Sequence, residues 1–140
     1  MEEHLYKLYE LYSSLEETVK EYDSLLSKVR EILDEEYGDV GDVVKSFNKM
    51  ESYRVKIRRT AEEIANVVGK LKNGKVKEEE YRSIVENLQT LLTFALEVSL
   101  EEEEYIALEV KDRGEQVTYK REELEESREA IKKVVEYLST

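Results

Sequence analysis

Acidic residues gather in the last third of the chain at spacings that suit metal binding. Glu109 and Asp112 lie three positions apart, and a second group follows at Glu122, Glu123 and Glu126. Carboxylates three or four residues apart project from one face of a helix, where their oxygens can ligate magnesium or calcium. Hydrolysis assisted by a bound magnesium ion is therefore the chemistry for which this sequence offers the most suitable residues.

The first group resembles half of the signature of the all-helical nucleotide pyrophosphohydrolases, in which Glu-Glu-x-x-Glu precedes a Glu-x-x-Asp pair. Here Glu109-x-x-Asp112 comes first, and Glu122, Glu123 and Glu126 follow it. Such spacings also arise by chance in a chain with 34 acidic residues among 140. A solvated charged face is the simpler interpretation, and a magnesium-dependent pyrophosphohydrolase is the third function that we consider.

Residues for other kinds of catalysis are missing from the sequence. The chain has no cysteine, and its one histidine, His4, lies close to the N-terminus. A Ser-His-Asp triad or a carboxylate di-iron centre needs histidines that other helices would hold in place. No glycine-rich phosphate loop occurs either. We therefore expect no enzymatic activity, no catalytic residue, no metal and no cofactor.

A short basic run, Arg54, Lys56, Arg58 and Arg59, offers a different activity. Arginines on neighbouring turns can contact successive phosphates or an acidic partner, which makes a nucleic-acid-associated or transcription regulator the second function. In the alternative interpretation, Arg54 sits in an apolar seam and bonds a carboxylate or a tyrosine, while Lys56 and Arg59 pair with acids of neighbouring helices. The net charge of -12 disfavours a broad nucleic-acid surface.

Two groups of apolar or aromatic residues predict a contact with a protein partner or a second copy. Between positions 84 and 100, apolar residues cover about 200 degrees of a helix, more than one core-facing stripe requires. The surplus is chiefly Phe94, Leu96 and Leu100, and it indicates either that this helix is the central buried one or that it carries a dimer or partner face. We favour the interface. Tyr6 and Tyr9 lie off the first helical seam, and tyrosine gives a large contact area at low entropy cost. These five residues form the predicted partner or dimer interface.

The elements that carry these residues follow from repeats of apolar residues at alternating steps of four and three. The first repeat is Met1, Leu5, Leu8, Tyr12, Leu15, Val19, Tyr22, Leu26, Val29 and Leu33. The second is Val43, Phe47, Met50, Arg54, Ile57, Ala61, Ile64, Val68 and Leu71. The third is Tyr81, Ile84, Leu88, Leu91, Ala95 and Val98. The last is Ile106, Val110, Arg113, Val117, Lys120, Leu124, Ser127, Ile131, Val134 and Leu138. Each repeat keeps its side chains on one stripe of a helix.

These repeats predict an all-α fold, an elongated antiparallel four-helix bundle with helices at about 2–36, 42–72, 77–111 and 115–139. The break near residues 112–115 is the weakest, because the last repeat runs straight through it. There is either a short turn, which lets the fourth helix fold back, or one continuous helix made of the third and fourth. In both cases we expect one helical-bundle domain.

Charge is distributed unevenly among these helices. Residues 42–77 contain ten Lys and Arg against four Asp and Glu, whereas residues 1–41 and 78–112 are strongly acidic. We therefore expect the basic helix to lie against both acidic segments along shared edges. Abundant Glu and Lys without Cys is typical of hyperthermophile proteins, so an archaeal or archaeal-virus source is consistent with the composition.

The sequence thus favours a non-enzymatic interaction, regulatory or assembly protein that presents an acidic helical surface and an apolar patch to a protein partner or a second copy. No apolar run reaches the length that spans a bilayer, and the first residues do not resemble a secretory signal. We therefore expect a cytoplasmic protein that does not bind membranes. Its partner and its biological process do not follow from the sequence.

Overall fold

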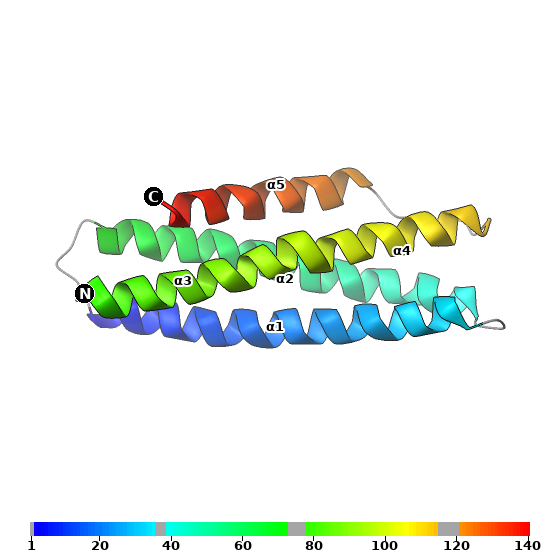
Figure 1. The fold of residues 1–140 in the computed structure, drawn as a ribbon, viewed down its shortest axis with the longest axis horizontal. Coiled ribbons are helices and arrows are strands. Elements are labelled where there is room, and N and C mark those ends of the chain that lie inside the picture. Colours follow the sequence, from blue (N-terminus) through cyan, green and yellow to red (C-terminus); the bar gives the residue numbers. More distant parts are fainter. Residues whose placement is uncertain (1, 36–38, 73–77, 115–120) are drawn as a thin grey trace.

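The protein is a bundle of long helices in the computed structural model, which describes residues 2–35, 39–72, 78–114 and 121–140. The elements are α1 (Glu2–Asp34), α2 (Val40–Lys72), α3 (Glu78–Phe94), η1 (Ala95–Ser99), α4 (Leu100–Asp112) and α5 (Arg121–Leu138). η1 is a short π-helical segment that joins α3 to α4 without a break (Figure 1). The described ranges contain no strand, and the predicted all-α, four-helix bundle is confirmed.

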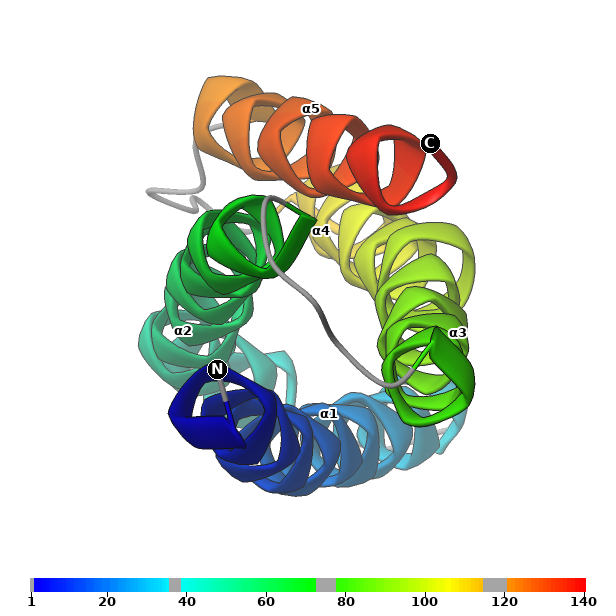
Figure 2. The same cartoon turned by 90° about the vertical axis from the view of Figure 1, so that its left-hand side faces the viewer.

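The helices form a ring in the order α1, α2, α5 and the long helix made of α3, η1 and α4 (Figure 2). Helices that follow one another in the chain run antiparallel, as predicted, whereas α5 runs parallel to its ring neighbour α2, and the long third helix runs parallel to α1 (Figure 1). α5 has 18 residues against 33 in α1 and in α2. It therefore lies along one part of the bundle only, toward the N-terminal end of α1, and the described helices at the opposite end are α1, α2 and α4 (Figure 1).

Most of the predicted seams form the core. The described α1 seam is buried from Leu8 to Leu33 except at Tyr12, which is half-buried, and Met1 lies outside the described residues. In α2 every predicted seam residue is buried except Phe47, which is half-buried against the core. The α5 seam is buried at Leu124, Ser127, Ile131, Val134 and Leu138. Alternating steps of four and three therefore predict which faces of these three helices turn inward.

Local signals set the described helix ends within a few residues of the predicted limits. The Asp39 carboxylate accepts a hydrogen bond from the Gly41 amide at 2.9 Å, which satisfies a free backbone donor at the start of α2. At the end of α4, Gly114 adopts φ of 85°, a left-handed conformation that favours glycine, and its amide donates to Lys111. α4 therefore ends before α5 begins, which confirms the predicted break. The predicted start at 115, and the seam positions Val117 and Lys120, lie outside the described residues.

The third predicted seam is wrong at Val98, which is 46% exposed, while Ser99 is fully buried. The reason is the π-helical turn of η1, which holds one residue more than an α-helical turn and moves the inward face along by one position. Leu100, Ile106 and Val110 consequently continue the core. The shift is visible in the sequence, because Val98 and Ile106 are eight residues apart and a heptad repeat would require seven.

The expected pairing of the basic helix with both acidic segments is only partly correct. α2 contacts α1 along its length and α5 from Arg54 toward its C-terminal end, and it contacts the long third helix mainly through α4. The acids of α4 are instead paired from the two sides, by Arg30 of α1 and by Arg128 of α5. The ring order decides these pairings, because α2 and the third helix stand across the bundle from each other (Figure 2).

A glycine on α2 provides a test of how α5 packs. A Cβ atom at Gly69 would lie 3.2 Å from the Tyr137 hydroxyl of α5. The Tyr137 side chain is partly exposed to solvent. We expect Gly69→Ala to raise the free energy of unfolding by about 0.5–1 kcal/mol, because alanine restricts the unfolded chain and Tyr137 can move slightly. Urea denaturation measures the change. Tyr137→Phe removes the contact, so Gly69→Ala in that background should raise the free energy of unfolding by at least as much, relative to Tyr137→Phe alone. A lower free energy of unfolding after Gly69→Ala in both backgrounds would contradict this packing.

Buried polar cluster and candidate interaction surface

Three polar side chains from three helices meet in the middle of the bundle. Arg54 of α2 donates from Nη1 to Glu103 Oε2 of α4 at 2.6 Å, and the Tyr22 hydroxyl of α1 donates to Glu103 Oε1 at 3.1 Å. Arg54 is 3% exposed, and Glu103 and Tyr22 are fully buried. Arg54 Nη2 also lies 3.9 Å from a carboxylate oxygen of Glu123 on α5. We call Tyr22, Arg54 and Glu103 the buried polar cluster.

The cluster lies beside the irregular turn of η1. Ser99, the last residue of η1, is one helical turn before Glu103, and its buried hydroxyl has no hydrogen-bond partner among the described residues. Arg54 Nε likewise has none in the same part of the chain. A buried polar atom without a partner costs about 1–3 kcal/mol, so this level of the bundle is costly to maintain. The cluster therefore contributes specificity of packing more than stability.

The sequence interpretation found one half of this cluster and missed the other. It placed Arg54 in the α2 seam with a carboxylate or tyrosine as its partner, and the structure confirms that interpretation. It did not single out Glu103, which is fully buried. A signal for it existed, since a step of three residues back from Ile106 reaches Glu103.

The outer face of the third helix carries large apolar side chains in solvent. Phe94 ends α3, Val98 lies in η1, and Tyr105 and Leu108 lie on α4; their exposed fractions are 39%, 46%, 53% and 47%. Steps of seven and three place Val98, Tyr105 and Leu108 on one side of the helix. We call these four residues the outer apolar face. The exposure of Val98 follows from the π-turn, because the extra residue rotates Val98 away from the core.

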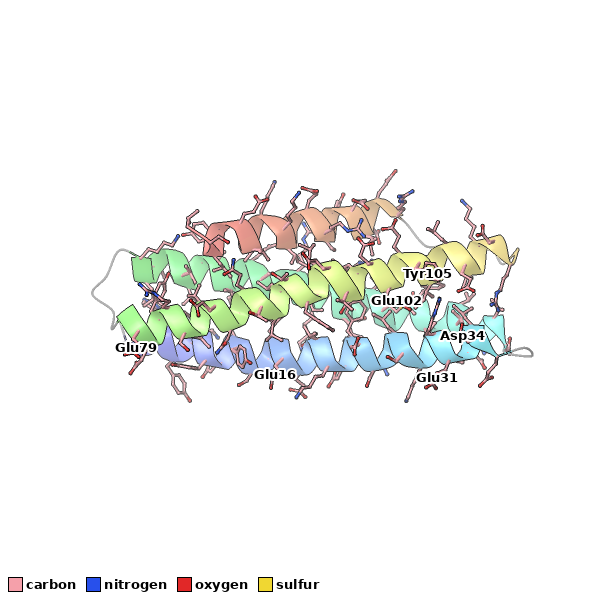
Figure 3. The ribbon with its side chains drawn as sticks, viewed as in Figure 1. Glu16, Glu31, Asp34, Glu79, Glu102 and Tyr105 are labelled. Atoms are coloured by element: carbon pink, nitrogen blue, oxygen red, sulfur yellow. The ribbon has the colours of Figure 1, made fainter. Side chains whose placement is uncertain are left out.

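Carboxylates and one arginine border the outer apolar face on the side of α1. Arg30 of α1 lies 2.9 Å from Glu109 and 3.7 Å from Glu102, and its guanidinium stacks over the Tyr105 ring at 4.4 Å. A hydrogen bond with Tyr105 raises the pKa of Arg30, and Glu102 and Glu109 act in the same direction. Figure 3 labels Glu102 and Tyr105 on α4 above Asp34 and other acids of α1. Arg30 therefore keeps its positive charge, and the carboxylates around it outnumber it.

The structure separates the residues of the predicted partner interface. Phe94 is exposed, as are Tyr6 and Tyr9 near the start of α1. Leu96 is half-buried against the core, and Leu100 is 1% exposed, so the placement of Leu100 on the surface is wrong. Both residues turn inward because η1 changes the phase of the helix. Tyr6 and Tyr9 belong to the start of α1 and Leu108 to the second half of α4, and the start of α1 and the end of α4 lie at opposite ends of the bundle (Figure 1).

The basic run does not form one surface. Arg54 is buried in the cluster, so it cannot contact a phosphate from solvent. Arg58 pairs with Glu62 at 3.1 Å and with Glu126 of α5 at 3.9 Å. Lys56 and Arg59 are exposed. Only these last two remain as candidates for contact with a phosphate or an acidic partner, and nucleic-acid binding stays a prediction without further support.

Three of the five carboxylates suggested for magnesium lie against arginines. Glu109 binds Arg30 and Arg113, Glu126 binds Arg58, and Glu123 approaches Arg54. Within the described ranges, no three Asp, Glu or His side chains come together in a way that could hold a metal ion. The two halves of the proposed pyrophosphohydrolase signature therefore serve contacts between helices in this structure.

These features define an all-helical bundle with a buried ionic cluster and an exposed apolar face. In the described chain, no helix has the length and the apolar character needed to cross a membrane. Comparison with protein-family models, with curated proteins and with solved structures found no match to this chain. Any function must therefore be argued from the surfaces themselves.

The buried polar cluster yields a prediction about stability. Glu103→Leu leaves Arg54 charged in the core, and we expect it to lower the free energy of unfolding by about 3–5 kcal/mol. The combination Tyr22→Phe, Arg54→Met and Glu103→Leu removes all three polar groups and should recover most of that loss, because no charge then remains buried. Guanidinium denaturation of the purified variants measures both values.

Arg58→Met is the matched control for this series. Arg58 also pairs with carboxylates, but it is partly exposed, so its removal should change the free energy of unfolding by less than about 1 kcal/mol. If the triple variant were as unstable as Glu103→Leu alone, the cost of burying an unpaired charge would not explain the cluster.

Proposed function

We propose that this chain is a non-catalytic interaction or assembly protein that binds a protein partner through the outer apolar face. The observation that carries the proposal is the exposure of Phe94, Val98, Tyr105 and Leu108 on one continuous helix. Single exposed apolar residues are ordinary, whereas a group of large ones on one helix face is typical of binding sites. Aromatic anchors within such a group supply most of the energy of many interfaces.

The surroundings of the face support this proposal. Tyr105 is held in place by the Arg30 guanidinium, which is itself fixed by Glu102 and Glu109. An anchor whose side chain is already ordered loses less entropy on binding. Exposed Glu97 and Glu101 lie between the apolar positions and can form a polar rim around a buried contact.

Photo-crosslinking from the face tests the proposal. With the photoreactive analogue p-benzoylphenylalanine in place of Leu108, we expect a discrete covalent adduct, either with a second copy or with one protein in an extract of the source cells. The mass of the adduct distinguishes these two partners. Val98→Glu should lower the yield by about tenfold or more, because a central anchor is worth more than 1 kcal/mol and a charge would have to be buried with it.

The control carries the same photoreactive group at Asn66, an exposed position of α2, and Asn48→Glu as the matched added charge. It should give no discrete adduct. The proposal fails if neither position yields an adduct, or if both positions yield the same adducts in equal amounts.

A further inference from the structure

A groove of about 1090 Å³ runs between α2 and α5 on the outside of the bundle. Its floor contains Ala65 of α2 and Ala130 and Val134 of α5. Val134 is buried and the two alanines are half-buried, so the floor is apolar and its side chains are small. Small residues let another helix approach closely. The apolar part of the groove can therefore bind apolar side chains from a second helix.

Charged side chains border this floor, and most of them are acidic. The carboxylates are Glu62, Glu122, Glu125, Glu126 and Glu129, against the cations Arg58, Arg121 and Lys133. Glu62 and Glu126 pair with Arg58, and Glu125 pairs with Arg128. Glu122 and Glu129 have no ion pair within the described residues. With five carboxylates against three cations, the rim carries a net negative charge.

The groove extends along α5 from Arg121 to Val134, which corresponds to about 20 Å of helix axis at 1.5 Å per residue. A bound helix of three to four turns would match this length. Apolar side chains on about one turn of this helix would rest on Ala65, Ala130 and Val134, and basic side chains along the remainder would meet the rim carboxylates. The complementary ligand is a basic amphipathic helix.

A second copy of this chain is a poorer occupant than a basic helix. Each copy carries a net charge of -12, so two copies repel each other as they approach. A basic partner is attracted by the same field, which accelerates its association. Charge complementarity therefore decides between the two occupants.

We propose that the groove between α2 and α5 binds a basic amphipathic helix of a partner protein. This site goes beyond the outer apolar face, because it is built by α2 and α5 and the face by the third helix (Figure 2). Substitutions in one site leave the residues of the other unchanged. Failure of one proposal is thus distinguishable from failure of the other.

A model peptide tests the groove directly. The probe is a fluorescent peptide of about 14 residues, close to four helical turns. It has leucine and alanine at heptad positions and lysine elsewhere, and its titration with the full-length protein is followed by anisotropy in about 0.15 M salt. Glu122→Gln with Glu129→Gln should raise the Kd about tenfold, because two rim charges are lost. Ala130→Gln keeps every charge but raises the floor, and it should also raise the Kd about fivefold or more.

Glu17→Gln with Glu31→Gln is the matched control, since it removes two exposed carboxylates from α1, which stands across the bundle from α5. It should change the Kd by less than about twofold. Circular dichroism establishes that each variant is helical. If the rim variant and the control variant raised the Kd equally, general charge attraction would explain the binding, and the proposal would be overturned. A peptide with glutamate in place of lysine that binds equally well would overturn it too, as would a doubled molecular mass of the protein alone that Ala130→Gln abolishes.

Discussion

Arg54 and Glu103 must meet inside the bundle, because either charge left alone at this depth would cost several kcal/mol. Their contact at 2.6 Å sets the level at which α2 passes α4, and the Tyr22 hydroxyl sets the level of α1 against both. A core of leucine, isoleucine and valine alone tolerates sliding of one helix along another, since apolar contacts are not directional. The cluster makes other registers unfavourable, because they would separate the charges.

The π-turn reconciles this contact with the packing of the long third helix. Before η1 the core is built by residues such as Leu88 and Leu92, and after it by Leu100, Ile106 and Val110. One extra residue in η1 brings both sets and Glu103 to the same side of the helix. The same residue turns Val98 outward. The outward position of Val98 and the inward position of Glu103 are therefore two consequences of one local irregularity.

Charged residues organise the outside of the bundle in a comparable way. Arg30, Arg58 and Arg128 each bind carboxylates of a neighbouring helix, so the acids of α4 and α5 are partly neutralised within the chain. The acids that remain unpaired give the surface its negative charge, and they border both proposed contact sites. The long-range field of such a surface attracts cationic molecules and repels anionic ones.

The sequence by itself determined the helices, the inward faces of α1, α2 and α5, and the presence of Arg54 in a seam, because regular spacing and glycine-marked turns are local properties. It also contained the eight-residue step between Val98 and Ile106, but a step of that kind does not say where the extra residue is placed. The burial of Leu100 and Glu103, the exposure of Val98, and the position of α2 across from the third helix were decided by the tertiary structure alone. They depend on which helices stand next to each other in the ring, and contacts between residues some 50 to 80 positions apart decide that order.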